Sequence, residues 1–132
     1  FLYAASSGTS HSAQHALAAM FRAAADGQLD FVGETSEYAR RARLTKEIFR
    51  RHGFRIVYDK DQDETVSDGF FYTVGYGAEL LSELLLYGIC AISLTSTGSR
   101  QPGIRVCVSQ LNCPEQFELL ETRLTAFGQN HR

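Results

Sequence analysis

The sequence predicts an α+β fold: a small sheet of three or four strands with helices packed on one of its faces. Between residues 54 and 110, short runs of alternating or aromatic residues are bounded by glycine or by polar turns, as is typical of strands. Longer segments with apolar residues three and four positions apart lie before, between and after these runs, as is typical of helices that bury one side. Strands with helices on one face form an α+β sandwich.

The first predicted helix lies between residues 10 and 27. Ser10 or Ser12 is placed to cap its first turn, and Gly27 is placed to end it. The apolar stripe of this helix is rich in alanine, so another backbone can approach it closely. We therefore expect this helix to pack against a surface outside its own segment.

The second predicted helix is long and basic and spans residues 34–53. Thr35 or Ser36 is expected to cap it, and Gly53 fits the position after its end. Glutamates share the helix with its arginines, so a solvated face is a better interpretation than a phosphate or RNA site. The arginines of this segment are Arg40, Arg41, Arg43, Arg50 and Arg51.

The rest of the chain is expected to form the sheet and two more helices. Strands are predicted at 54–60, 70–76, 89–95 and 104–110, and helices at 78–88 and 113–128. Pro114 suits the first turn of the last helix, whose apolar residues recur with helical spacing. The acidic turn after residue 58 lacks the glycine and the distal glutamate of an EF-hand calcium loop, so a solvated hairpin turn is favoured.

The strand at 104–110 carries the most informative polar residue. Apolar and polar residues alternate along it, so Arg105, Cys107 and Ser109 share one face, opposite the isoleucine and valines. A guanidinium matches a carboxylate with two parallel hydrogen bonds. It can equally cover the rim of a sheet with its methylene groups. From the pattern alone, carboxylate binding and a rim position are equally supported for Arg105.

Composition narrows the class of protein. The length of 132 residues suits one domain, and a net charge of −2 argues against nucleic acid as a partner. No apolar run is long enough to span a membrane, and no secretory signal is evident. Three cysteines without a CxxC motif fit a reduced, cytoplasmic protein. Neither Lys46 nor Lys60 is expected in an apolar pocket that would lower its pKa for covalent chemistry.

Nearly the whole chain resembles the C-terminal part of class I/II, fold-type I pyridoxal-phosphate-dependent aminotransferases. The segments that carry the resemblance, in chain order, are "SSGTSHSAQHALAAM", "SDGFFYTV", "ELLLYGICAISLTSTG", "GIRVCVS" and "ETRLTAF". The resemblance implies that residues 1–27 are the end of the large cofactor domain, with a dimer-interface helix. It implies that residues 28–132 are the small C-terminal domain, led by a long interdomain helix.

The resemblance also assigns roles to particular residues. Arg105 looks like the arginine that binds the substrate's α-carboxylate, and Phe71 looks like the aromatic residue that borders the substrate pocket. Ser7, Thr9 and Ser10 look like an interface segment that approaches the active site of the neighbouring subunit. The family's cofactor lysine has no counterpart in these 132 residues, so pyridoxal phosphate is expected to be anchored outside them.

The activity implied by the resemblance is amino-group transfer from an amino acid to a 2-oxo acid. The whole enzyme is expected to be a cytoplasmic homodimer that acts in amino-acid metabolism and binds neither nucleic acid nor membrane. This segment alone is expected to be inactive. The loop "TSTGSRQPG" departs from the family pattern, and its Arg100 is either a reader of acidic side chains or a surface residue.

Two alternatives remain open. The chain could be a stand-alone module that binds a small carboxylate through Arg105 without chemistry. It could also be a non-transaminating relative from the same superfamily, such as a lyase, a decarboxylase or a domain of a transcription regulator.

Overall fold

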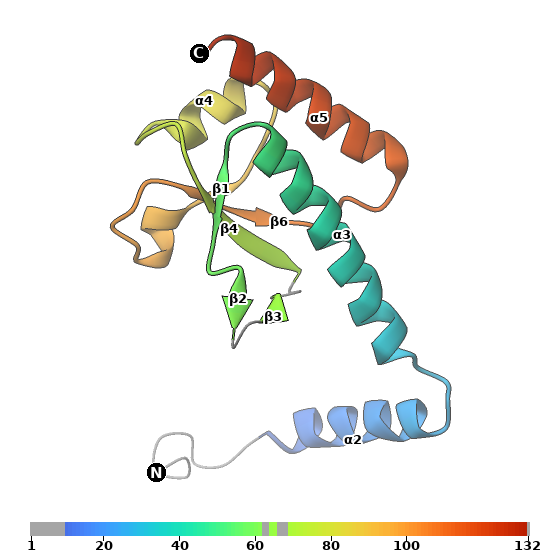
Figure 1. The fold of residues 1–132 in the computed structure, drawn as a ribbon. Coiled ribbons are helices and arrows are strands. Elements are labelled where there is room, and N and C mark those ends of the chain that lie inside the picture. The colour runs from blue at the N-terminus through green and yellow to red at the C-terminus, as the bar shows by residue number, and fades with distance from the viewer. Residues whose placement is uncertain (1–9, 62–63, 66–68, 132) are drawn as a thin grey trace. The chain divides into compact units, whose positions relative to one another are not determined.

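The computed structural model describes residues 10–61, 64–65 and 69–131, and in them the predicted α+β class is confirmed (Figure 1). The helices are α2 (His11–Ala25), α3 (Phe31–Arg51), α4 (Leu80–Leu86) and α5 (Pro114–Gln129), with a 3-10 helix η1 (Leu94–Thr97). The strands are β1 (Arg55–Val57), β2 (Lys60–Asp61), β3 (Glu64–Thr65), β4 (Phe70–Val74), β5 (Ile92–Ser93) and β6 (Ile104–Cys107).

Four strands form one antiparallel sheet in the order β1-β4-β6-β5, and β2 and β3 pair separately. In the register of β4 with β6, Phe71 lies opposite Val106 and Tyr72 lies opposite Arg105. Successive side chains of a strand point to opposite faces. Phe71 and Val106 therefore share what we call the core face, and Tyr72 and Arg105 share the outer face.

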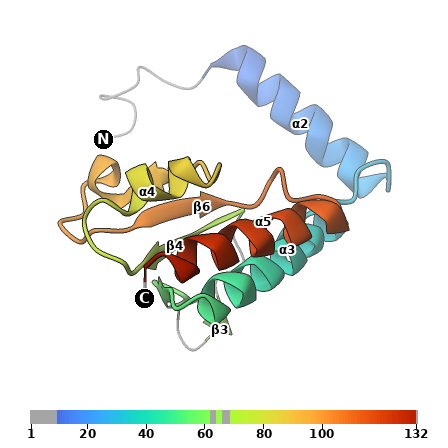
Figure 2. The same ribbon diagram turned by 90° about the horizontal axis from the view of Figure 1, so that it is seen from above.

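Helices α3 and α5 lie side by side in both views (Figures 1 and 2). Their buried side chains belong to the same cluster as those of the core face. Phe49 of α3 is fully buried at the centre, and its ring meets the edges of Phe54 and Phe71 at centroid distances of 5.0 and 5.6 Å. Leu80 and Leu84 of α4 join the cluster. The main buried cluster thus lies on the core face, whereas Val74 and Leu94 are buried outside this cluster.

The chain divides into two compact units, Phe1–Glu34 and Thr35–Arg132. In the first unit, α2 begins as expected, because the Ser10 hydroxyl accepts a hydrogen bond from the backbone N–H of Ala13. No side chain of α2 is buried. The second unit holds the four-stranded sheet and, among the residues described, every member of the buried hydrophobic cluster.

Three predicted boundaries were wrong. Helix α3 begins four residues before Thr35, because the Asp30 carboxylate accepts a hydrogen bond from the backbone N–H of Gly33 at 2.8 Å and caps it there. The strand expected at 89–95 is only Ile92–Ser93, because the chain turns at once into η1. The strand expected at 54–60 is only Arg55–Val57, and the short antiparallel β2–β3 pair follows it. No helix in the described part of the chain could cross a membrane.

Candidate functional site

Strand β6 sets the position and direction of Arg105. Its neighbours Ile104 and Val106 are buried on the core face, whereas Arg105 is half-buried on the outer face. The strand is paired on both sides at this point, with Tyr72 of β4 and Ile92 of β5. Because ladder pairing fixes the backbone, the side chain must leave the sheet on the outer face. The alternation predicted for this strand is confirmed.

The guanidinium of Arg105 lies over an aromatic ring. Its Cζ is 5.2 Å from the ring centroid of Phe70, the first residue of β4. Within the residues that the structure describes, the guanidinium of Arg105 has no hydrogen-bond or ion-pair partner. This contrasts with four arginines of α3 that each pair with a carboxylate: Arg40, Arg41, Arg50 and Arg51. The donors of Arg105 are thus not engaged by an acidic side chain of the described part, and its position is held by a ring.

Cys107 and Ser109 continue the outer face beyond Arg105. The Cys107 Sγ and the Ser109 Oγ are 3.1 Å apart. Hydrogen bonding by the Ser109 side chain, then by its backbone, lowers the pKa of the Cys107 thiol, and the positive charge of Arg105 lowers it further. Each of these contributions favours negative charge at this point of the surface. The outer face around Arg105 is therefore suited to an anion.

A cavity of about 460 Å³ opens beside Arg105, at the edge of β6 that β5 leaves uncovered. We call it the β6-edge cavity. Its lining is mostly apolar and comes from β6, from the segment that leads into β5, and from α5. The residues that matter most to its chemistry are Cys90, Ile92, Arg105, Cys107, Leu119 and Leu120. An apolar hollow beside an arginine suits a ligand with one anionic end and one apolar end.

Phe71, the other residue assigned to a substrate pocket, lies on the opposite face of the sheet. Its side chain is 4% exposed and packs against Phe49 in the core. The structure brings Arg105 together with Phe70, not with Phe71. Sequence reasoning missed Phe70, although the strand period offered a signal: Phe70 and Tyr72 have the same parity along β4. What the sequence lacked was the register that places this parity beside Arg105.

The remaining predicted residues are dispersed. Ser10 caps α2, and Ser7 and Thr9 lie outside the described residues. Arg100 is exposed in the loop between η1 and β6. Among the residues described, no group of three metal-ligating side chains occurs. From the acidic turn, Asp59 instead forms ion pairs with α3.

The environment of Lys46 differs from the expected one. Its side chain is buried, with the residue only 3% exposed, and its Nζ is 2.7 Å from the Asp59 carboxylate and 6.0 Å from the ring centroid of Phe71. Arg50 binds the other oxygen of Asp59 from the solvent side at 2.5 Å. An ammonium held in this way does not fit the role of a cofactor-binding amine. Lys46 thus lies in a buried ion pair with Asp59.

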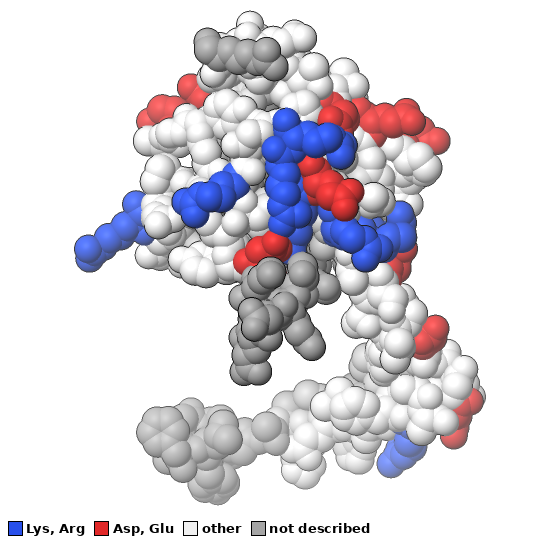
Figure 3. Space-filling view, in the orientation of Figure 1, with Lys and Arg blue, Asp and Glu red and all other residues white. Residues whose placement is uncertain are grey.

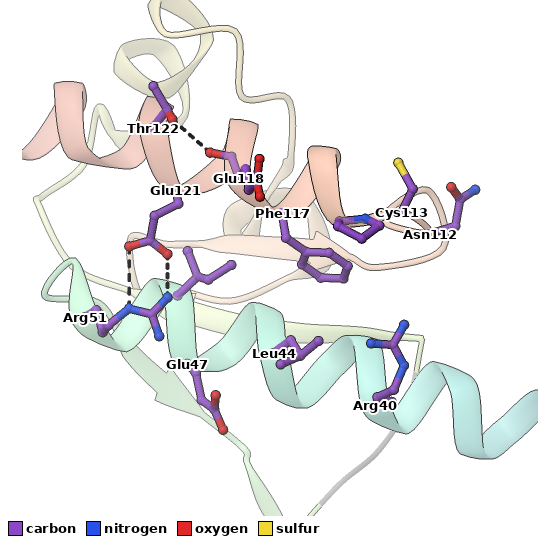
Figure 4. A pocket seen from close by; sticks show the side chains of 12 residues that line it. Arg40, Leu44, Glu47, Arg51, Asn112, Cys113, Phe117, Glu118, Glu121 and Thr122 are labelled. Atoms are coloured by element: carbon purple, nitrogen blue, oxygen red, sulfur yellow. Dashed lines mark hydrogen bonds and ion pairs between the residues drawn. The ribbon is translucent and has the colours of Figure 1, made fainter.

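A second cavity, of about 600 Å³, lies between α3 and α5 (Figure 4). Leu44 of α3 and Phe117 of α5 contribute apolar surface to it, and Phe117 points toward α3. On its rim, Arg51 binds Glu121 at 2.5 Å, and this hydrogen bond is the main cause of the lowered pKa of Glu121. His52 also contacts Glu121, at 2.8 Å. These contacts on the rim thus connect the two helices.

Basic and acidic side chains lie next to one another on the face shown in Figure 3. This matches the ion pairs that α3 forms, for example Arg40 and Arg41 with Glu37. Comparison with known proteins adds no family: no family model matches the chain, and no curated protein matches it.

Proposed function

We propose that this chain is the C-terminal domain of a pyridoxal-phosphate-dependent aminotransferase and that Arg105 binds the α-carboxylate of the amino-acid substrate. The observation that carries the proposal is the state of Arg105. It is half-buried on a paired strand, its guanidinium rests against Phe70, and it has no acidic partner in the described residues. The resemblance of the flanking segments to the small domain of this family supports the same role.

Arg105 would orient the substrate. A planar guanidinium can donate two parallel hydrogen bonds to one carboxylate, which fixes both the position and the rotation of that group. The pairing of β6 and the ring of Phe70 hold the guanidinium in place before the substrate binds. Since amino acids and 2-oxo acids both carry this carboxylate, the same contact would serve both substrates of the transfer. The contact therefore sets orientation and does not select the side chain.

Pyridoxal phosphate, when bound, supplies the electron sink for chemistry at the amino acid's α-carbon. The proposal assigns its anchoring to residues outside this chain, because Lys46 is buried against Asp59. What the chain itself contributes is carboxylate binding and, in the cytoplasmic homodimer that we propose, one wall of the substrate site.

The experiment that tests this proposal is an absorbance spectrum of the whole purified protein, recorded before and after the addition of amino acids. We expect a visible band from bound pyridoxal phosphate that shifts when an amino acid is added. The Arg105→Lys variant should show the same band but need a higher amino-acid concentration for the shift. A colourless protein that takes up no added cofactor would contradict the proposal.

A second candidate is a carboxylate-binding module without chemistry. One observation favours it: all members of the buried core cluster found in the described residues lie within 35–132, so this unit has what a self-contained domain needs. Such a module would bind small carboxylates through Arg105 while showing no cofactor band. A cofactor band that responds to amino acids without amino-group transfer would instead indicate a non-transaminating relative.

A further inference from the structure

Two cysteines flank the uncovered edge of β6. In the β5–β6 ladder, Ile92 lies opposite Arg105 and Ser93 lies opposite Ile104, and Leu94 N–H donates to the carbonyl of Gly103 at 2.9 Å. Antiparallel facing pairs keep a constant sum of residue numbers. The ladder itself ends at Ile92; if it continued by two more residues, the next facing pair on the same side of the sheet would be Cys90 with Cys107.

The exposure of the two cysteines agrees with this continued pairing. Ile89 is buried and Cys90 is exposed, as Val106 is buried and Cys107 is exposed. Both cysteines are free, and both line the β6-edge cavity. Cys113, the third cysteine, is half-buried at the start of α5 and lines the other cavity, between α3 and α5. Cys90 and Cys107 are thus a candidate pair, and Cys113 serves as an internal control.

The two thiols have different surroundings. Cys107 has Ser109 Oγ at 3.1 Å and the positive charge of Arg105 nearby, and both lower its pKa. A thiol with more thiolate at neutral pH reacts faster with an electrophile such as a hydroperoxide. For Cys90, which lies at the other edge of the gap, no such neighbours are found among the residues described. Cys107 is thus suited to react first, and Cys90 to react with its product.

We propose that Cys90 and Cys107 form a redox pair that a hydroperoxide converts into a disulfide across the β5–β6 edge. The Cys107 thiolate attacks the peroxide oxygen, which breaks the O–O bond and gives a sulfenic acid and an alcohol, or water when the oxidant is hydrogen peroxide. The Cys90 thiol then attacks the sulfenic sulfur, and water leaves as the S–S bond forms. Two thiols are oxidised by two electrons, and one peroxide is reduced.

The disulfide would extend the sheet. If Cys90 joined the ladder, its Cα would lie about 4.5–5.5 Å from that of Cys107, as for any facing pair, which is within the range that a disulfide spans. Closing the gap would tie residues 90–92 to β6 directly beside Arg105. The pair is inferred from register and exposure and does not depend on the function proposed above.

The test is treatment of the dilute purified protein with a small excess of hydrogen peroxide, followed by alkylation under denaturing conditions and mass spectrometry. Two of the three thiols should become resistant to alkylation, with a loss of two hydrogens. Trypsin should then yield a crosslink between the peptides 61–100 and 106–123, which carry Cys90 and Cys107. Because 106–123 also contains Cys113, fragmentation must show the alkyl group on Cys113.

Three variants sharpen the result. Cys113→Ser should leave the crosslink unchanged, Cys90→Ser should leave Cys107 as a trappable sulfenic acid, and Ser109→Ala should slow the loss of thiols. A crosslink that uses Cys113, one that appears only between two molecules, or three thiols that survive the peroxide would overturn the proposal. The number of thiols that react with peroxide is measured independently of any cofactor band. Failure of the redox-pair proposal can therefore be told apart from failure of the aminotransferase proposal.

Discussion

The two faces of the four-stranded sheet are made from the same strands but differ in what lies against them. The core face carries Phe71, Ile104 and Val106 beneath α3 and α5, and all three are buried. The outer face carries Phe70 and Arg105 one position away on the same strands, and both keep exposed surface. Alternation along a strand thus separates the residues that stabilise the domain from those available for binding.

The comparison also shows two ways in which the domain holds a cation. Lys46 is buried and forms an ion pair with Asp59. The guanidinium of Arg105 lies over the ring of Phe70 and has no acidic partner in the part of the chain described. A buried cation needs a paired carboxylate, because removing an isolated charge from water is costly. A half-exposed cation remains in contact with water, and an anionic ligand can replace that water. The first arrangement is structural, and the second suits a ligand.

The largest predicted effect is the difference in stability between the Phe71→Ala and Phe70→Ala variants. Phe71→Ala would leave a cavity in the core beside Phe49 and should lower the free energy of unfolding by about 3–5 kcal/mol. Phe70 is 37% exposed, so Phe70→Ala should cost about 1 kcal/mol or less. Chemical denaturation of the two variants measures both. Equal losses would contradict the division of the sheet into a core face and an outer face.

The next effect concerns the buried ion pair. Asp59→Asn would remove the carboxylate that lies 2.7 Å from the Lys46 Nζ, and we expect a loss of about 2–3 kcal/mol, less than for a fully buried pair because Asp59 is partly exposed.

The control for the buried pair is Arg50→Gln, which removes the exposed partner of the same Asp59 carboxylate. It should cost less than about 1 kcal/mol, as is usual for exposed ion pairs. Denaturation midpoints distinguish the two variants, and a neutral Asp59→Asn would show that the ion pair between Lys46 and Asp59 does not stabilise the fold.

The smallest effect is the pH dependence carried by Glu121. Its pKa is lowered from 4.5 in the folded state, chiefly by the hydrogen bond from Arg51. Its contribution to stability is therefore complete above the unfolded pKa and is lost as the pH falls through the lower folded value. At pH 7, Glu121→Gln should cost less than about 1 kcal/mol, since the pair is solvent-screened.

Denaturation at a series of pH values checks this prediction. The difference between wild type and Glu121→Gln should shrink below about pH 4.5 and vanish once the wild-type carboxyl is protonated. A difference that stays constant down to strongly acidic pH would mean that the substitution acts through packing of α3 against α5. It would not then act through charge.

Much of the fold follows from local patterns in the sequence. The alternation around Arg105, the helical stripe of α5 and the caps at Ser10 and Gly27 are each determined within a few residues. The predicted start of α3 was wrong because Thr35 and Ser36 are also suitable capping residues. Which residue caps the helix depends on which side chain reaches an unpaired backbone N–H, and here it is Asp30. Strand β5 was overestimated because pairing with β6, not propensity, decides where it ends.

The site was less predictable because it depends on long-range register. The sequence marks Arg105 as unusual, but only the pairing of β4 with β6 shows that Phe70 lies beneath it. The burial of Lys46 was missed for the same reason. Its carboxylate partner, Asp59, lies in a turn 13 positions along the chain, and nothing in the local pattern brings the two together. Pairings between segments decide both cases.

Titration of carboxylates against Arg105 tests the central claim most directly. Nitrogen-15 NMR of arginine side chains would follow amino acids and 2-oxo acids added to wild type, Arg105→Lys and Arg100→Lys. We expect a saturable shift of the Arg105 Nε signal, affinity weakened by about 2–3 kcal/mol in Arg105→Lys, and no change in Arg100→Lys. Wild-type affinity in Arg105→Lys would show that Arg105 only covers the rim of the sheet.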